Sequence, residues 1–470
     1  MPPGATERPT GGGHRHALTG AGGPARHDRG MRRPVGRVSR RTAVLAGLLA
    51  AAVVAAIVGA VLVTVPTGGR AAPCTARKIA SWTPDPRLTH AFARYGDDNS
   101  RTDDWTGGDG THSVRLPDGR TLWLFSDTFL DRIQPPPNPK GQPHSWRAKA
   151  AGSGPPGLIR NSVIVSGRSG RPYDTLIRRT PAGPAGYFPD PPRSQGAAGA
   201  WRWPVAARVE PRAPGAPGSS VHVLRVLLWN RAPGKGPWLF GEPRTTEVAT
   251  LSLPGLRLEH VTTVGDRTPA ADPAARVLYG TAAVPRGRHT YVFGGDAPTD
   301  RPAASAYLAR VPTGRLADPR AWRYWDGHGW RTDPERAAPV LRSGGRRGVG
   351  SAFTVVRDGG TWVLFTMAAA GGGGRGLATV TSYWSCSARG PWHGPNGAIT
   401  PPRPPDPAGS AERTAVYNPQ VHPEFTDRHG LLLSYDVNTL GPPGTAATGA
   451  VNDDVSLYRP RFLRVRLTAG

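Results

Sequence analysis

The stretch VRLPDGRTLWLF, Val114 to Phe125, sets the architecture of this chain because it returns in altered form further along the sequence. Similar units, each an apolar strand, a glycine-containing turn and an aromatic-rich strand, lie at 282–293, 354–365 and 423–435, with a weaker one at 218–229. The turns of the last three units are about seventy residues apart, which suits a four-stranded unit. Self-similarity of this kind is typical of β-propellers. We therefore predict an all-β, five-bladed β-propeller over residues 86–470.

The segments between these units follow the same pattern. Alternating apolar residues predict strands at 248–253 and 462–467. Two long Pro/Gly-rich segments, 134–157 and 189–218, are predicted to be surface insertions within the propeller.

The turn in the first unit fixes a strand register. Pro117 restricts its φ to negative values, which favours a type I turn with Gly119 in the left-handed position of a three-residue loop. Leu116 then faces Arg120, and each pair of facing residues has numbers that sum to 236. Counted outward, Val114 faces Leu122 and, at the open end, Asp109 faces Asp127.

Residues directly opposed across an antiparallel pair share one face, with Cβ atoms roughly 5 Å apart. Two carboxyl groups held in this way favour a state in which one keeps its proton while the other ionises, as an acid–base pair requires. The alternative is that GGDG is a glycine-rich turn and SDT a strand-end cap. Asp296, Asp436 and Asn230 follow the aromatic-rich strands of other units, so we expect them near the same mouth of a propeller channel.

A long apolar segment precedes the propeller. Residues 42–65 carry no charge and are long enough to cross a bilayer, with an arginine-rich flank before them and only Arg70 soon after. We predict a basic, disordered cytoplasmic tail (1–41), a transmembrane signal anchor (42–65), a linker (66–85) and an extracellular domain. A cleaved signal peptide, with the twin-arginine-like SRRTAVL, is the alternative.

The formal net charge is +26. The arginines are scattered, without a basic helix or an aromatic RNA-stacking motif, so we expect no nucleic-acid partner. A coding bias toward arginine explains the charge equally well, and a basic surface for anionic cell-envelope polymers lies between these interpretations. The chain has two cysteines, Cys74 and Cys386, for which an extracellular disulfide is chemically reasonable, with two free buried thiols as the alternative.

Four motifs, GGDGTHSVRLPDGRTLWLFSDTFL, YNPQVHPEF, LLLSYDVN and YRPRF, resemble secreted actinobacterial propeller domains related to the endo-D-arabinanases, of the five-bladed furanosidase type. The resemblance implies that Asp109 and Asp127 are the catalytic carboxylates. It further implies a set of site-lining residues: Asn161, Tyr417, Asn418, His422 and Asn438. His422 has an alternative role in a hydrogen bond to a neighbouring loop. For Arg459 and Arg461 we favour a role in locking the closing strand.

These observations predict a membrane-anchored, extracytoplasmic glycoside hydrolase that acts on furanosyl or related glycan polymers through paired aspartates. The distance between the carboxyl groups, which decides between a retaining and an inverting course, stays open. No cofactor is needed, although a cation in the channel is compatible with its carboxylates. The alternative is a non-catalytic glycan-binding or scaffolding propeller, in which several tryptophans stack on sugars: Trp201, Trp203, Trp322, Trp325 and Trp330.

Overall fold

The computed structural model of the chain describes these residues: 73–101, 104–130, 133, 157–192, 198–212, 215, 218, 221–234, 241–266, 272–301, 303–369, 378–405, 414–439 and 454–470. The predicted tail and transmembrane segment (1–65) and most of the predicted insertion 134–157 lie outside them. Within the described residues, no helix is both long and apolar enough to span a bilayer. Residues 71–470 form one compact unit.

Five antiparallel sheets of four or five strands make up most of this unit. The first contains β3 (His112–Arg115), β4 (Thr121–Phe125), β7 (Ser162–Ser166) and β8 (Pro172–Leu176). The second contains β11 (Trp201–Pro211), β12 (His222–Ala232), β13 (Glu242–Ser252) and β14 (Leu258–Asp266). The third contains β15 (Leu278–Arg286), β16 (His289–Gly295), β17 (Ala306–Pro312), β18 (Arg323–Trp325) and β19 (Trp330–Arg331).

The fourth sheet contains β20 (Phe353–Asp358), β21 (Thr361–Met367), β22 (Val380–Ser385) and β23 (His393–Ile399). The fifth contains β24 (Thr414–Val421), β25 (Leu431–Thr439), β26 (Arg461–Ala469) and β1 (Arg77–Pro84). Two small sheets consist of β2 (Trp105–Gly108), β5 (Thr128–Leu130) and β6 (Leu158–Ile159), and of β9 (Arg178–Thr180) and β10 (Gly183–Ala185). The helical elements are α2 (Pro86–Asp97) and the 3₁₀ turns η1 (Pro273–Ala275), η2 (Pro319–Ala321), η3 (Pro334–Arg336), η5 (Pro423–Phe425) and η6 (Val455–Tyr458).

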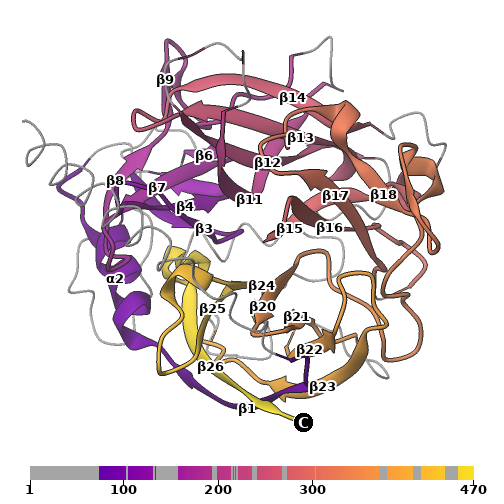
Figure 1. Ribbon diagram of the computed structural model, residues 1–470. Coiled ribbons are helices and arrows are strands. Elements are labelled where there is room, and N and C mark those ends of the chain that lie inside the picture. Colours follow the sequence, from indigo (N-terminus) through magenta and orange to yellow (C-terminus); the bar gives the residue numbers. More distant parts are fainter. Residues whose placement is uncertain are drawn as a thin grey trace, which may run out of the picture. The chain divides into compact units, whose positions relative to one another are not determined.

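The five large sheets surround a centre toward which each turns its first strand, β3, β11, β15, β20 or β24 (Figure 1). Separate hydrophobic clusters fill the spaces between the first and second, second and third, third and fourth, and fourth and fifth sheets. A fifth, aromatic cluster packs the last sheet against the first through α2. Burial of apolar surface between successive sheets is the main stabilising contribution in such a layout, and the fold is all-β and propeller-like, as predicted.

Three predicted units, 114–125, 282–293 and 354–365, contain the first two strands of a sheet, whereas 218–229 and 423–435 each contain only the second strand, β12 or β25. The strands predicted at 248–253 and 462–467 correspond to β13 and β26. The predicted insertion 189–218 is wrong, since it contains β11, the innermost strand of the second sheet. Proline content misled that prediction. Pro204 is tolerated because β11 has a partner on one side only, and the register shifts between Pro204 and Ala206.

The start of the unit also differs from the prediction. The segment 66–85, predicted as a linker, contains β1, which pairs with β26 and so brings the first and last strands of the unit together. Helix α2 was not predicted. Asp85 caps it by accepting a hydrogen bond from the Leu88 amide at 3.1 Å, Pro86 occupies its first turn, and Phe92 on its buried face packs edge-on against Trp123.

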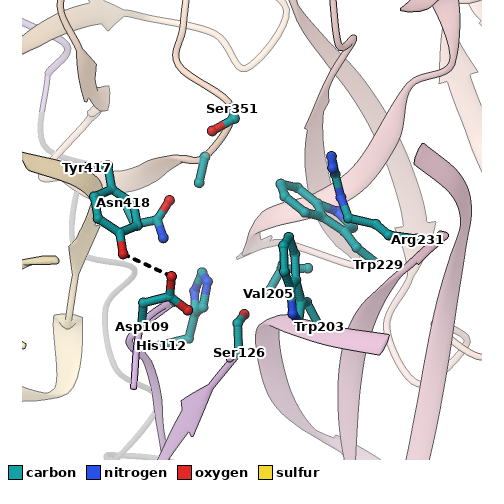
Figure 2. A pocket seen from close by; sticks show the side chains of 12 residues that line it. Asp109, His112, Ser126, Trp203, Val205, Trp229, Arg231, Ser351, Tyr417 and Asn418 are labelled. Carbon is teal, nitrogen blue, oxygen red and sulfur yellow. Dashed lines mark hydrogen bonds between the residues drawn. The ribbon is translucent and has the colours of Figure 1, made fainter. Parts of the chain in front are cut away.

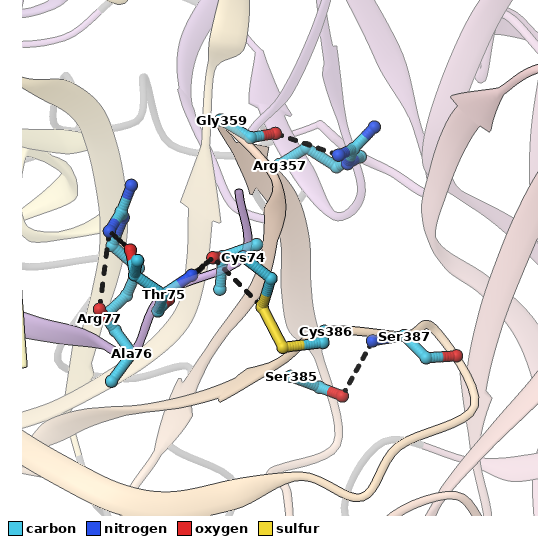
Figure 3. The surroundings of a disulfide bond; sticks show 10 residues. Cys74, Thr75, Ala76, Arg77, Arg357, Gly359, Ser385, Cys386 and Ser387 are labelled. Atoms are coloured by element: carbon cyan, nitrogen blue, oxygen red, sulfur yellow. Dashed lines mark hydrogen bonds between the residues drawn. A yellow bond between two sulfur atoms is a disulfide. The ribbon is translucent and has the colours of Figure 1, made fainter. Parts of the chain in front are cut away.

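The unit contains the expected disulfide between Cys74 and Cys386, whose Cα atoms lie 5.5 Å apart (Figure 3). It joins the segment before β1 to the residue after β22, and therefore links the closing strand to the neighbouring fourth sheet. The Thr75 amide and carbonyl both bond to the Thr361 hydroxyl, and Arg77 pairs with Asp358. This segment, residues 74–77, is therefore held against the turn between β20 and β21.

Candidate active site

The first hairpin has the register that the turn predicts. Val114 pairs with Leu122, Ser113 with Trp123, and the count continues to Gly108 opposite Thr128. Gly119 has a φ of +89°. Between the β3–β4 pair and the β2–β5 pair, the Asp109 amide donates to the Asp127 carbonyl at 3.2 Å, and the Ser126 amide donates to the Asp109 carbonyl at 2.7 Å. The two aspartates are therefore opposed at the open end of the hairpin.

Asp109 is held so that its protonated form is favoured. The Tyr417 hydroxyl donates to Asp109 Oδ2 at 3.0 Å, while Oδ1 is buried and has no hydrogen-bond partner. Burial, together with the negative charges of Asp127 and Asp436, raises the pKa of Asp109 well above its usual value, and hydrogen bonds from Tyr458 and Tyr417 only partly offset this. A carboxyl group that keeps its proton near neutral pH is suited to act as a general acid.

Asp127 has a different environment. Arg160 Nη1 lies 3.2 Å from Oδ1 and 3.0 Å from Oδ2, and the Trp203 indole donates to Oδ1 at 2.9 Å. Burial raises the pKa of Asp127, but Arg160 and Trp203 act against that rise. The side chain is 20% exposed. The ionised form is thus favoured at Asp127 relative to Asp109, because Asp127 has a cationic partner.

A third carboxylate lies beneath this pair. Asp436 accepts hydrogen bonds from the Gly110 amide at 2.7 Å, the Thr111 hydroxyl at 2.9 Å and the Asn418 amide group at 3.2 Å. Burial raises the pKa of Asp436 to about 6, although these donors lower it. Asp436, on the last sheet, therefore anchors the loop that carries Asp109 on the first.

Asp109 and its partner Tyr417 line a cavity of about 40 Å³ at one end of the inner strands, which we call the site mouth (Figure 2). Its lining residues are Asp109, Gly110, His112, Ser126, Trp203, Val205, Trp229, Arg231, Ser351, Ala352, Tyr417 and Asn418. In Figure 2 the carboxyl group of Asp109 and the indoles of Trp203 and Trp229 lie on opposite sides of the opening. The mouth thus combines a proton donor with an aromatic wall, and four sheets contribute to it.

Beyond the site mouth, the inner strands enclose a larger cavity of about 660 Å³ that extends toward the other end of the sheets. His112 lines both cavities, and burial lowers its pKa to about 3, so it is neutral at physiological pH. In the described ranges, no group of three or more His, Cys, Asp or Glu side chains is arranged to hold a metal ion. The cation considered for the channel stays a prediction.

The structure places Asp109, Asp127, Tyr417, Asn418 and Asp436 together, but not the other predicted residues. Asn161 is fully buried, where its amide group donates to the carbonyls of Phe188 and Arg202 and accepts from the Phe188 amide. The ring nitrogens of His422 bond to the hydroxyls of Ser113 and Ser434. Both side chains therefore connect neighbouring parts of the fold and do not line the mouth.

Three more predicted positions also lie apart from the carboxyl pair. Asp296 accepts from the Ser305 amide and pairs with Arg301. Asn438 Oδ1 accepts from the amide of the next residue. Asn230 is buried and donates to Glu247, because the alternation along β12 turns Trp229 and Arg231 toward the mouth instead.

Arg160 and Tyr458 are site residues that the sequence analysis missed. Each directly precedes a residue that we singled out, Asn161 or Arg459. Arg160 contacts Asp127 from beside the first sheet, whereas Tyr458 reaches Asp109 from the segment before β26 of the last sheet. Arg459 and Arg461 bond mainly to backbone carbonyls near the closing strand, which agrees with the structural role that we favoured. Of the tryptophans considered for sugar stacking, Trp322 is buried with its indole bonded to the Leu316 carbonyl, whereas Trp203 lies at the mouth.

Comparison with solved structures gives a likeness to a protein from Bacteroides ovatus that was crystallised as a candidate hydrolase, with a TM-score of 0.58 and 19% identity over 82% of this chain and 90% of that chain. At this identity the match concerns the fold alone. The GH62 α-L-arabinofuranosidase catalytic domain of Coprinopsis cinerea matches at a TM-score of 0.40 and 13% identity, over 78% of this chain and 92% of that one. An exo-1,5-α-L-arabinanase from a bovine ruminal metagenomic library matches at a TM-score of 0.37 and 10% identity, over 78% of this chain and 94% of that one. TM-scores of this size do not establish a common fold.

Fold and site together define an all-β, propeller-like protein with opposed carboxyl groups at one end of its inner strands. The chain belongs to the family described as a domain of unknown function, DUF5005, whose family model matches residues 92–467. Comparison with curated proteins gives no match.

Proposed function

We propose that residues 71–470 form a five-bladed glycoside hydrolase domain whose catalytic carboxyl groups are Asp109 and Asp127. The observation that carries this proposal is the unequal environment of the two opposed side chains: Asp109 Oδ1 is unpartnered, whereas Asp127 is paired with Arg160. Glycosidic bond cleavage needs one carboxylic acid and one carboxylate on either side of the bond.

In the proposed reaction, Asp109 donates its proton to the leaving glycosidic oxygen. Asp127 either removes a proton from a water that attacks the anomeric carbon, or attacks that carbon itself to form a glycosyl ester, which a water deprotonated by Asp109 then hydrolyses. Tyr417 orients Asp109 through Oδ2, so the acidic proton is assigned to the buried Oδ1, which has no hydrogen-bond partner within the described residues. Asp436 supports the proton on Asp109 through its negative charge.

The size of the site mouth bears on how a glycan would bind. A cavity of about 40 Å³ accommodates water but not a sugar ring. The glycan would therefore lie across the opening, against the indoles of Trp203 and Trp229, with only its reacting bond between the carboxyl groups. The resemblance to endo-D-arabinanases favours arabinofuranosyl polymers of the cell envelope or environment as the substrate.

We also propose that the domain is extracytoplasmic and tethered by the uncharged segment 42–65. The disulfide between Cys74 and Cys386 agrees with an oxidising compartment. Protease protection of intact cells, with antibodies to each end of the chain, tests this topology and separates an anchored protein from one that is released after signal cleavage.

The test of the enzymatic proposal is release of reducing ends by residues 71–470 from arabinan-containing and other envelope glycans. Asp109→Asn and Asp127→Asn should each abolish release, whereas Asp174→Asn, an exposed aspartate on the outer strand β8, should not. Release that survives both site substitutions would end this proposal. Glycan binding without turnover, unchanged in both variants, would favour a non-catalytic glycan-binding domain.

A further inference from the structure

The end of the sheets opposite the site mouth carries excess positive charge. In each large sheet the turn after the first strand lies at this end, and antiparallel pairing brings the turn after the third strand beside it, as when Thr121 pairs with Ser166 and Val223 with Ser252. The arginines of these turns that are exposed and form no salt bridge within the described residues are Arg168, Arg171, Arg257, Arg286, Arg288, Arg320, Arg389 and Arg428. We call this set the arginine face.

Five acidic side chains in and beside these turns do not neutralise the arginine face, because each forms a salt bridge with a different arginine, whereas Glu424 forms no salt bridge within the described residues and acts on Arg115. The pairs are Asp118 with Arg120, Glu259 with Arg212, Asp318 with Arg315, Asp358 with Arg77 and Asp427 with Arg464.

Like charges accumulate at this end as a result. The guanidinium of Arg168 lies beside the turn of the first hairpin, 3.5 Å from the point where a Cβ atom on Gly119 would stand. Arg115 belongs to the same hairpin. Burial lowers the pKa of Arg115, and the positive charge of Arg168 lowers it further, although Glu424 opposes this. Burial and the positive charge of Arg286 likewise lower the pKa of Arg357. Repulsion that the fold does not relieve internally is relieved when an anionic surface binds.

The chain also enters the domain at this end. Cys74, Thr75 and Arg77 are held at the turn between β20 and β21 by the disulfide, the Thr361 hydroxyl and Asp358. Figure 3 places Arg357 and Gly359 of this turn in the surroundings of the disulfide. Eight residues separate the uncharged segment 42–65 from Cys74 in the sequence, and eight residues span at most about 30 Å when fully extended.

We propose that the arginine face docks on a bilayer surface that carries anionic phospholipid headgroups. The face has unneutralised guanidinium groups from all five large sheets, and Cys74, which lies at this end of the sheets, follows a membrane-length apolar segment in the sequence. Docking in this way directs the site mouth away from the lipid, toward glycans. The proposal concerns a surface remote from the carboxyl pair and does not depend on hydrolysis.

Vesicle co-sedimentation of residues 71–470, which lack the apolar segment but retain the whole described core and the disulfide, tests the proposal. We expect binding to phosphatidylcholine vesicles that contain phosphatidylglycerol, little binding to pure phosphatidylcholine, and a steep loss of binding with added salt. Equal binding to both vesicle types would overturn the proposal.

Matched arginine pairs locate the contact. Replacing Arg286 and Arg288 together by Gln should weaken binding roughly 30-fold, since each arginine near an anionic surface contributes about a factor of five. Arg168→Gln with Arg171→Gln should do the same. The control pair is Arg342→Gln with Arg346→Gln, which is equally exposed but lies near the start of β17, at the other end of the sheets, and should change binding less than twofold.

Three results would contradict a lipid-docking face. The control pair could weaken binding as much as the other pairs, which would show a response to net charge alone. The loss could be confined to one pair, which would show a local site and not a face. Inorganic polyphosphate could bind the domain more tightly than the vesicles do, with the same dependence on the arginine face, which would show a site for a soluble polyanion. All variants change exposed side chains only, so an unaltered thermal melt checks their folding.

Discussion

The two ends of the inner strands use charge in opposite ways. At the site mouth three acidic side chains lie within one buried cluster, and the fold tolerates them by protonation, by hydrogen bonds from Gly110, Thr111 and Tyr417, and by one arginine. At the arginine face the charges are exposed and form no salt bridge within the described residues. Buried like charges alter the chemistry of the groups themselves, whereas exposed like charges act on what lies outside the protein. The domain therefore has an acidic end, which we propose to be reactive, and a basic end, which we propose to be adhesive.

The largest expected effect belongs to the carboxyl pair. Asp109→Asn and Asp127→Asn should each lower kcat/KM on natural glycans by roughly 10³-fold, the scale of a lost acid or base. An aryl glycoside with a good leaving group needs no proton from an acid, so it should restore much of the activity of Asp109→Asn but none of that of Asp127→Asn. Equal restoration of both variants would contradict the assigned roles.

The second effect concerns stability at the adhesive end. Replacing Cys74 and Cys386 together by Ser should lower the free energy of unfolding by about 2–5 kcal/mol, because the bond closes a very long loop in the unfolded chain. Denaturant titration measures this, and reduction of the wild-type protein should reproduce it. The pH dependence of kcat should not change. A shifted pH profile would show that the two ends are coupled.

The third effect is the pH dependence of stability that Asp436 causes. Its pKa is about 6 in the folded protein and about 3.9 in an unfolded chain. Between these two pH values the folded state holds a proton that the unfolded state releases, so the contribution of Asp436 to stability is greatest below about pH 4 and is lost as the pH rises through 6. The two pKa values correspond to a loss of roughly 3 kcal/mol. Urea titrations at several pH values should show this slope in the wild type and a flatter one in Asp436→Asn. Equal slopes would contradict the assignment.

The fourth effect is smaller and reports on Asp127. Arg160→Gln removes the cation that lowers the pKa of Asp127, so this carboxylate should take up a proton at higher pH. The acidic limb of kcat/KM should move to higher pH, with about a tenfold loss near neutral pH. Arg342→Gln, an exposed arginine at the same end of the sheets, is the control and should leave the profile unchanged.

The smallest effect expected is at the arginine face. Arg286→Gln with Arg288→Gln should leave kcat/KM on soluble glycans within about twofold, because exposed charges at the other end of the domain act through screened solvent. A loss on soluble substrate as large as that of Arg160→Gln would remove the distinction between the two ends.

Local features of the sequence were sufficient for much of the fold. The register of the first hairpin follows from Pro117 and Gly119, since a turn type fixes the residues that face one another. Strands with alternating apolar residues were predicted correctly because successive side chains along a strand point to opposite faces, which is also a local feature. Helix α2 was missed although its signal, Asp85 followed by Pro86, stands in the sequence. Strand β11 was missed because its proline is acceptable only on a strand with one free side, which the sequence does not show.

The site divides in the same way. The sequence by itself determined the repeated strand–turn–strand units and placed Asp109 opposite Asp127, because these depend on residues close together along the chain. Only the tertiary structure decided that Arg160 and Trp203 lie on Asp127, that Tyr417 and Asp436 lie beside Asp109, and that Asn161 and His422 are turned away from the mouth. The physical reason is that burial and the charges of other sheets set the protonation of a carboxyl group, and these arise only when the sheets pack around their common centre.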